Sequence, residues 1–560
     1  MINANQLEND TRTQDKLRGG YYTSPLIAKL LCNWAIRSSS DFILEPSCGD
    51  GVFIEAAINK LSELGARDNQ VLNQLVGVEI LSTEAEKSHD RFKGFIDNYS
   101  QNSIYTDDFF PWIINNFDKQ FNCVVGNPPF IRYQNFPEPS RSVAMSLLKK
   151  LDFRPNKLTN IWVPFVAAST IALAPGGRLA MVLPAELLQV SYASQLRSFL
   201  VNRFNRIDIL TCNDLLFERA EQEVVLFLAD GYREKPDSEQ CHINLIEVPR
   251  MEDLVLKMSS IDIDDEIKLV NHESEKWLKY FLTSTEISFM RELRNSPEIV
   301  NLSHHATIDV GIVTGKNDFF VVSNNEIETY LLKDYVVPLV GRSSQLKGAI
   351  LKKSEWKQFA DNGQKVFLFS INDNSNGSLS KEVKEYISFG EHNNFHTGYK
   401  CSIRSPWYKV PSVWIPDCFL FRQIYDFPRV ILNTASAVST DTIHRMRCKS
   451  NRKKIISSMY THLTAACAEI EGRSYGGGVL ELEPTEAERL LIPKNLVEGV
   501  SIQEIDELIR MGRIEHLLEE NDKKVLIDSI GFSERDSNML KGIWMKMRNR
   551  RMSRSRRKKQ

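Results

Sequence analysis

The 560-residue sequence lacks long hydrophobic runs, and this excludes several classes of protein. No stretch approaches the roughly 20 consecutive apolar residues that a membrane-spanning helix needs. The first twenty residues also lack the apolar core of a secretory signal peptide. These absences predict a cytoplasmic protein that has no membrane partner.

The sequence also lacks the usual patterns of a metal or disulfide protein. Its nine cysteines form no CxxC pair and do not alternate with histidine, so neither a zinc site nor a disulfide framework is predicted. His392 and His396 are four residues apart, but the segment between them lacks the glutamate of the zinc-protease motif. We therefore expect no metal.

A formal net charge of −2 hides a basic C-terminal end. Residues 541–560 contain ten Lys or Arg and no Asp or Glu, which creates a strong local positive field. Such a run is either a solvated end or a sequence-independent anchor for nucleic acid. The sequence leaves both alternatives open.

What the sequence does contain is a regular alternation of apolar runs and helical stretches between about residues 20 and 230. The expected strands are FILE, LVGVEI, NCVVGN, GRLAMVLP, RIDILTC and VVLFLA. This alternation predicts an α/β fold, a mostly parallel sheet with helices on its faces, and ligands bind such sheets at the carboxyl ends of the strands. After about residue 235 the alternation stops. We expect a flexible arm (1–20), the α/β domain (21–235), a second domain (236–500) and a helical region with the basic tail (501–560).

A glycine-rich turn follows the first expected strand, at Ile43–Gly51. Gly49 and Gly51 would let a ligand approach the backbone, although many such turns are plain loops. Ile54 stands where a dinucleotide-binding motif has its third glycine. The carboxylate of Glu45 would repel a phosphate and attract a sulfonium ion, so S-adenosylmethionine is favoured over NAD.

Two later strand ends offer further cofactor contacts. Glu79 ends the run at 75–79, where nucleotide-binding sheets place the acid that holds the ribose hydroxyls. Asp107-Asp108-Phe109 offers an acceptor for an adenine amino group beside an apolar wall. The alternatives are a surface acid for Glu79 and a solvated turn or helix cap for the Asp pair.

The candidate catalytic loop is Asn127-Pro128-Pro129-Phe130, directly after an apolar strand. Two prolines hold this loop extended. An adenine amino nitrogen attacks a methyl group only after its lone pair is localised, and the Asn127 side-chain oxygen and the Pro128 carbonyl can each accept one N–H bond from it. Phe130 offers a ring on which a flipped base can stack. The alternative is a plain Pro-Pro turn.

With these motifs, the sequence resembles the γ-class DNA N6-adenine methyltransferases of bacterial restriction–modification systems over most of its length. That class has an N-terminal motif, the glycine motif, the catalytic loop and a target-recognition domain in this order. The resemblance implies a Rossmann-like methyltransferase sheet with helices on both faces, and a C-terminal mixed α/β target-recognition domain. It also implies methyl transfer from S-adenosylmethionine to a flipped adenine in double-stranded DNA.

The resemblance also implies roles for particular residues. Gly20–Pro25 looks like the N-terminal motif of the family, which implies that Tyr22, Thr23 and Pro25 cradle the methionine end of the cofactor. The other implied cofactor contacts are Glu45, Pro46, Ser47, Gly49, Gly51, Glu79, Asp108 and Phe109. Phe130 replaces the tyrosine that is most frequent there, which keeps stacking and loses a hydroxyl. Phe217 stands where the family has a second aromatic against the flipped base, with a plain core residue as the alternative.

Later segments are less specific. Asn160–Phe165, Pro175–Arg178 and Leu196–Arg197 look like scaffold motifs of the family. Gly311–Asp318 and Arg473–Gly478 resemble segments of its recognition domains, or are simple turns. No base-reading side chain can be chosen from the sequence.

Two other functions stay open at this point. The Asn-Pro-Pro loop also occurs in methyltransferases that modify a protein glutamine amide, although a second domain of about 260 residues suits duplex DNA better. A non-catalytic DNA-binding subunit would have lost site residues that are intact here. The chain offers no room for a fused nuclease, so a cognate restriction endonuclease, where there is one, is expected to be encoded separately. We expect a monomer.

Overall fold

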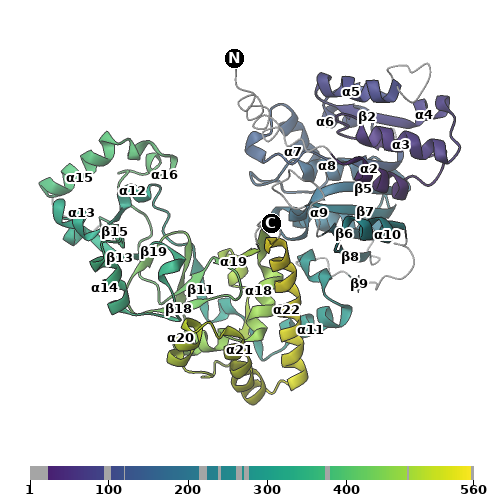
Figure 1. Cartoon of the computed structure of the whole chain (residues 1–560). Helices are drawn as coiled ribbons and strands as arrows, with labels where there is room; N and C mark the ends of the chain where they lie inside the picture. The colour runs from purple at the N-terminus through teal and green to yellow at the C-terminus, as the bar shows by residue number, and fades with distance from the viewer. Residues whose placement is uncertain are drawn as a thin grey trace. The chain divides into compact units, whose positions relative to one another are not determined.

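The computed structural model describes most of the chain, and its described residues fall into two compact units, unit 1 (Met1–Ile287) and unit 2 (Ser288–Gln560) (Figure 1). The described residues are 23–93, 103–118, 120–212, 224–236, 241–259, 268–269, 276–371, 379–475 and 478–556. Two predicted site residues, Tyr22 and Phe217, lie outside them, as does the predicted N-terminal arm.

Unit 1 is built on a nine-stranded sheet with the order β3-β2-β1-β4-β5-β7-β6-β8-β9. Its strands are β1 (Ile43–Glu45), β2 (Leu75–Glu79), β3 (Ile104–Thr106), β4 (Phe121–Gly126), β5 (Leu173–Pro184), β6 (Phe204–Cys212), β7 (Val224–Tyr232), β8 (His242–Val248) and β9 (Lys268–Leu269). The strands from β3 to β5 pair in parallel, whereas β7 runs antiparallel to β5 and β6. Each strand expected from the sequence is present.

Both faces of this sheet are covered. Successive residues of a strand point to opposite faces, and every residue from Leu179 to Leu183 in β5 is buried. The helices of unit 1 are α2 (Pro25–Ala35), α3 (Val52–Glu63), α4 (Asp68–Gln74), α5 (Ser82–Lys93), α6 (Phe109–Asn115), α7 (Ser140–Lys150), α8 (Trp162–Ile171), α9 (Ser194–Val201) and α10 (Met251–Ser259). Residues of α2, α3, α5 and α10 share one apolar core with the sheet, and α6, α7 and α8 pack together. The predicted α/β fold is confirmed.

The sheet extends further along the chain than expected. Residue 235 was the expected end of the first domain, but β8 follows it and pairs in parallel with β6. The two compact units divide between Ile287 and Ser288. A strand that only extends an existing sheet has no sequence pattern that marks it as part of the first domain. This explains why the predicted domain boundary lies before β8.

Unit 2 has several small sheets rather than one large one. Its largest sheet has five strands in the order β11-β20-β16-β18-β14, and a second has four in the order β12-β15-β13-β19. The strands are β10 (Ile299–Asn301), β11 (Ala306–Asp309), β12 (Val321–Val322), β13 (Val336–Val340), β14 (Ile350–Leu351), β15 (Phe367–Phe369), β16 (Cys418–Phe421), β17 (Gln423–Ile424), β18 (Val430–Asn433), β19 (Val438–Ser439), β20 (Ile443–Cys448), β21 (Arg473–Tyr475), β22 (Val479–Glu481) and β23 (Leu491–Pro493).

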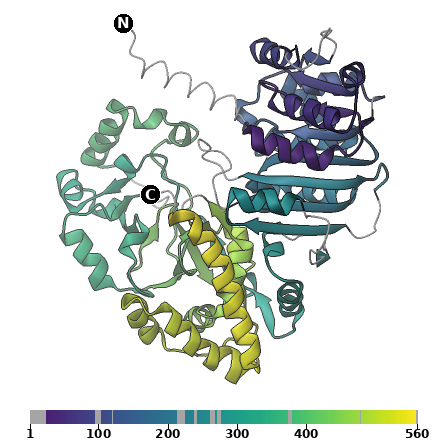
Figure 2. The same cartoon turned by 45° about the vertical axis from the view of Figure 1, so that its right-hand side comes forward.

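Helices surround these sheets and fill the end of the chain. They are α11 (Ser284–Asn295), α12 (Asn317–Phe320), α13 (Asn324–Thr329), α14 (Lys353–Asp361), α15 (Lys381–His392), α16 (Tyr399–Ser402), α17 (Arg452–Met459), α18 (His462–Glu471), α19 (Pro484–Ala487), α20 (Ile502–Arg510), α21 (Ile514–Asp522) with a π-helical continuation (Lys523–Ile530), and α22 (Glu534–Arg556). Figure 2 shows α22 as the long helix of unit 2. It packs against α18.

Two searches of the described part of the chain bear on function. None of its helices combines the length and the apolar character that crossing a bilayer requires. No group of three or more His, Cys, Asp or Glu side chains in those residues is arranged to hold a metal ion.

Candidate active site

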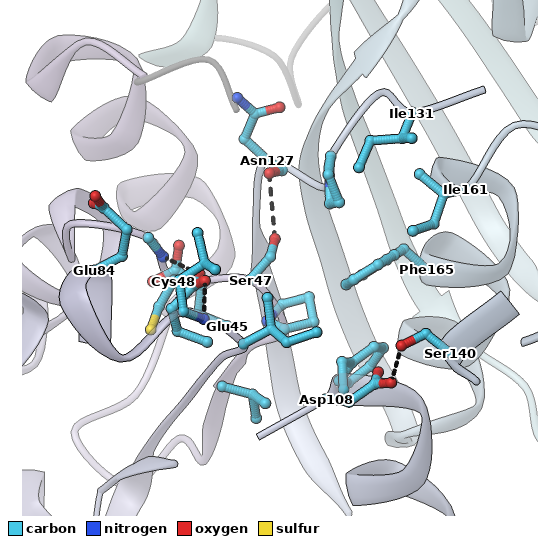
Figure 3. A pocket seen from close by; sticks show the side chains of 18 of the residues that line it. Glu45, Ser47, Cys48, Glu84, Asp108, Asn127, Ile131, Ser140, Ile161 and Phe165 are labelled. Atoms are coloured by element: carbon cyan, nitrogen blue, oxygen red, sulfur yellow. Dashed lines mark hydrogen bonds between the residues drawn. The ribbon is translucent and has the colours of Figure 1, made fainter. Parts of the chain in front are cut away.

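A cavity of about 390 Å³ lies at the carboxyl ends of β1, β2, β3 and β4, where open α/β sheets bind their ligands. Its volume is within the range of small-molecule sites, roughly 300–1,000 Å³. Each of the four strands contributes the residues that directly follow it. Figure 3 shows polar side chains such as Glu45 and Ser47 on one side, and the apolar side chains of Ile131, Ile161 and Phe165 on the other.

The two glycines of the first turn serve different purposes. Both have positive φ angles, +51° at Gly49 and +85° at Gly51, which favour glycine. A Cβ atom at Gly49 would meet nothing within 4 Å, and this residue lines the cavity. A Cβ atom at Gly51 would lie 2.9 Å from the Cα atom of Ser88 on α5. Gly49 therefore keeps space open for a ligand, whereas Gly51 permits α5 to pack closely and does not line the cavity.

Glu79 is held at the cavity by backbone amides. Its Oε2 atom accepts a hydrogen bond from the Gly49 amide at 2.9 Å, and its Oε1 atom accepts one from the Leu81 amide at 2.9 Å. Burial raises the pKa of the Glu79 carboxyl, and the backbone bonds partly oppose this. Because a carboxylate oxygen has a second lone pair, both oxygens can still accept bonds from a ligand.

Glu45 is a buried carboxylate without a cationic partner among the described residues. Its side chain is 1% exposed, and its Oε2 atom has no hydrogen-bond partner there. Burial, followed by the charges of Asp50 and Glu79, raises the pKa of Glu45 well above its ordinary value. Because a buried charge is stabilised by an opposite charge, a cationic group in the cavity would favour the ionised form.

Asp108 borders the cavity and also caps a helix. Its Oδ1 atom accepts a hydrogen bond from the Phe110 amide at 3.1 Å, which makes it the N-cap of α6. The Ser140 hydroxyl donates to its Oδ2 atom. The next residue, Phe109, is buried and stacks on Phe165 with ring centroids 5.1 Å apart. The helix cap that the sequence left as an alternative is therefore present, and it places the carboxylate beside an aromatic wall.

Asn127 directly follows β4 and lines the same cavity. Its Nδ2 atom donates to the Thr23 hydroxyl at 3.2 Å. Its backbone carbonyl accepts a bond from the Ser47 hydroxyl at 3.3 Å, as Figure 3 shows. Thr23 and Ser47 are two of the predicted cofactor residues, and both line the cavity. The candidate catalytic loop is thus tied directly to two neighbouring segments that are distant in the sequence.

Comparison with known proteins follows the same two-part division. The family model described as Eco57I restriction-modification methylase matches residues 51–217, and the model for the C-terminal domain of the type II methyltransferase M.Eco57I matches residues 274–526. The chain belongs to the restriction–modification methyltransferases. The γ-class resemblance is thereby confirmed, and membership makes the chain a DNA methyltransferase.

Individual relatives of this methyltransferase cover much of its length. The type II methyltransferase M.AccI of Acinetobacter calcoaceticus is 20% identical over 513 residues, 88% of each chain. M.BstVI of Geobacillus stearothermophilus is 21% identical over 379 residues, 61% of this chain and 66% of the relative. The solved structure of the type IIL enzyme MmeI in complex with DNA has a TM-score of 0.53 at 11% identity, covering 92% of this chain and 73% of that one, and shows a shared fold.

The structure of this methyltransferase gathers most of the predicted site residues around the cavity. The predicted residues that line it are Thr23, Glu45, Pro46, Ser47, Gly49, Glu79, Asp108, Phe109, Asn127 and Pro129. Four others do not line it. Pro25 is an exposed first residue of α2, Gly51 packs against α5, Pro128 is buried, and Phe130 packs against the apolar core of the sheet.

Sequence reasoning named Phe109 in the apolar wall of the cavity and missed the other residues of that wall. Ile161 and Phe165 come from the segment that was interpreted only as scaffold, and the family motif was the signal that could have assigned them. Phe136 and Ser140 follow the catalytic loop within the next ten residues. They belong to no motif, so the sequence alone gave no means of finding them.

Proposed function

We propose that this methyltransferase transfers the methyl group of S-adenosylmethionine to the N6 atom of a specific adenine in double-stranded DNA. The observation that carries the proposal is that Asn127 and Pro129 line the same cavity as Gly49 and Glu79. The loop that offers hydrogen-bond acceptors to the base and the strand end that is expected to hold the cofactor ribose thus border one cavity. Transfer requires the two reactants to meet in such a space.

The residues of the cavity fit S-adenosylmethionine. When bound, it supplies an electrophilic methyl group on a positively charged sulfur. Glu45 favours a cationic ligand because it is buried without a counter-charge among the described residues. Glu79 presents oxygens for two ribose hydroxyls, and Gly49 leaves open space beside them. Asp108 and Phe109 are proposed to contact the cofactor adenine.

For the target base, we propose that the Asn127 side-chain oxygen accepts one N6–H bond. We propose that the Pro128 carbonyl, which does not line the cavity in this structure, accepts the other when the base is bound. The bond to Thr23 orients the Asn127 amide. Two acceptors draw the amino nitrogen towards tetrahedral geometry and stabilise the charge that develops on it during attack. The base must leave the duplex to reach these atoms.

We also propose that the flipped base packs against the rings of Phe130 and Phe217. Phe130 is half-buried and packs against the apolar core of the sheet, so stacking of the flipped base uses the part of the ring that stays exposed. Phe217 lies outside the described residues.

We further propose that residues 236–500 include the target-recognition domain. The enzyme is proposed to act in the cytoplasm as a monomer and to protect host DNA from a separately encoded restriction endonuclease.

Nucleoside analysis of methylated DNA tests the proposal. The protein is expressed in a host without DNA methyltransferases of its own, and digested DNA is analysed by mass spectrometry while long-read sequencing reports the sequence context. We expect N6-methyladenine in one context. Unmodified DNA, or methylated glutamine in cellular proteins in its place, would contradict the proposal.

A further inference from the structure

A row of basic side chains lies along strand β20 in unit 2 and continues one residue beyond its end. Arg445, Arg447 and Lys449 are two residues apart, so they point to one face of the strand and its continuation. β11 is the neighbouring edge strand, and in its antiparallel register Thr307 stands opposite Arg447 and Asp309 opposite Arg445. These residues define what we call the β20 face.

An aromatic ring fixes two of these side chains. The guanidinium carbon of Arg445 lies 4.5 Å from the centroid of the Trp414 ring, and that of Arg447 lies 4.6 Å from it. Arg445 is buried and donates to the backbone carbonyls of Val310 at 3.0 Å and Ser412 at 2.6 Å. Arg445 is therefore a structural residue, which ties the two loops at the edge of the β20 face together.

Unlike Arg445, Arg447 has guanidinium N–H donors that remain available to a ligand. It is exposed, and none of the polar contacts found among the described residues involves its guanidinium. The nearest acid along the register, Asp417, accepts the Cys448 amide at 2.9 Å and lies 3.8 Å from Arg452. Asp309 stands opposite Arg445, not opposite Arg447. The planar donor group of Arg447 thus faces solvent beside a second positive charge.

A basic hollow adjoins the β20 face through Lys449. It has a volume of about 570 Å³, and its lining includes Arg294, His304 and Lys449 but no carboxylate residue. The Arg294 guanidinium pairs with Glu471 at 2.7 Å, whereas Lys449 donates to the Ser303 carbonyl at 2.6 Å and stays exposed. A hollow of this charge suits phosphate groups.

We infer that Arg447 is a base-reading residue of this methyltransferase, whose guanidinium donates two hydrogen bonds to the O6 and N7 atoms of a guanine in the recognition sequence. The adjacent hollow receives backbone phosphates. This inference rests on the proposed function, because it takes double-stranded DNA as the ligand.

Stacking favours base reading over a phosphate contact alone. Lysine binds phosphates as a point charge, so a phosphate contact does not require a planar donor group, although arginine also makes such contacts. A two-bond contact to guanine needs a flat donor pair in a fixed plane. Packing on Trp414 restricts the plane of Arg447 in this way.

The test compares variants on defined DNA. Wild-type protein first gives the recognition sequence by long-read sequencing. Duplexes are then made in which each guanine of that sequence is replaced, one at a time, by 7-deazaguanine, which lacks the N7 acceptor. Methylation rates are measured for wild type, Arg447→Ala and Arg447→Lys. Arg535→Ala, which removes an exposed arginine on α22, is the matched control. Equal thermal midpoints establish that each variant is folded.

We expect Arg447→Ala to lower methylation of the intact site by about 10-fold or more. Arg447→Lys keeps the positive charge, but it should lose most of the preference for guanine over the other bases at that position. One 7-deazaguanine position should slow wild type and leave Arg447→Ala unchanged, because the two changes remove one contact. Arg535→Ala should behave as wild type.

Three results would overturn the inference: a recognition sequence without guanine, an Arg447→Ala variant that methylates every duplex as wild type does, or an equal loss on all sequences, which indicates a phosphate contact. In each case wild type still methylates DNA. If wild type methylates no DNA, the proposed function itself fails, so the two failures are distinguishable.

Discussion

Two buried carboxylates, one in each unit, differ in whether a positive charge compensates them. Glu469 on α18 is paired with Arg551 on α22, with an Nη2–Oε1 distance of 2.5 Å and an Nε–Oε2 distance of 3.0 Å. Glu45 at the cavity of unit 1 is equally buried, yet its Oε2 atom has no partner among the described residues.

The pKa directions express the same contrast. Burial raises the pKa of both carboxyls, but at Glu469 the bonds and charge of Arg551 oppose the rise. At Glu45 the next contributions are the negative charges of Asp50 and Glu79, which raise the pKa further. A compensated buried charge joins two helices, whereas an uncompensated one at a cavity marks a place for a cationic ligand.

The largest expected effect on stability comes from breaking the compensated pair. Arg551→Ala leaves Glu469 buried without its partner and should lower the free energy of unfolding by about 3–5 kcal/mol. Chemical denaturation followed by circular dichroism measures this. Arg535→Ala on the same helix is the control and should change stability little. An Arg551→Ala variant as stable as wild type would show that α22 does not depend on the pair.

At the cavity, removing an acid should affect binding more than folding. Glu79→Ala removes the proposed acceptor of two ribose hydroxyls and should weaken S-adenosylmethionine binding about 10- to 100-fold, since bonds to a charged group contribute about 1.5–3 kcal/mol. Isothermal titration calorimetry reports the dissociation constant. Glu63→Ala, at the exposed end of α3, serves as the control. An unchanged dissociation constant for Glu79→Ala would refute the ribose assignment.

The two glycines next to these acids separate binding from packing. Gly51→Ala should destabilise the protein by about 1–3 kcal/mol, because its Cβ atom would meet the backbone of Ser88. Gly49→Ala has open space, so it should destabilise the fold less and weaken cofactor binding more. Thermal midpoints and calorimetry on both variants give the two quantities. The reverse order of effects would contradict the roles assigned here.

The smallest effect is expected from Glu45→Gln and depends on pH. Because the pKa of Glu45 is raised in the folded protein, that state binds the proton more tightly than the unfolded chain does. The stability of wild type therefore falls as pH increases from the ordinary value of 4.5 through the raised pKa. Glutamine does not ionise and avoids this loss.

Thermal midpoints measure the Glu45→Gln effect without ligand. The variant should gain a few degrees over wild type near pH 9, at about 2–4 °C for each kcal/mol, and the gain should shrink near pH 5. It should also bind S-adenosylmethionine more weakly. A stability difference that does not change with pH would indicate that Glu45 carries no unfavourable charge in the free protein.

The sequence predicted the cavity better than any other part of the molecule, for a physical reason. Glu45, Glu79, Asp108 and Asn127 each stand at or just after the carboxyl end of a strand of one sheet, so strand prediction alone brings them to one edge. The sequence could not tell that Phe130 packs against the core or that Gly51 serves α5, because both facts depend on contacts with distant residues.

Unit 2 could not be predicted to the same degree. The β20 face and the Trp414 ring beside it combine three separate segments, represented by Thr307, Trp414 and Arg447. Only antiparallel pairing and a loop contact bring these segments together. No local pattern signals such a surface. The basic tail was visible in the composition, but the burial of Arg551 within it was not.

Asn127→Ala tests the central claim most directly when both functions of the cavity are measured on one sample. Single-turnover methyl transfer to the recognition duplex and calorimetric binding of S-adenosylmethionine are compared with wild type and with Asn115→Ala, an exposed control at the end of α6. The account predicts that transfer by Asn127→Ala falls by about 100-fold or more while cofactor affinity stays near that of wild type. Transfer by Asn127→Ala at the wild-type rate would contradict it.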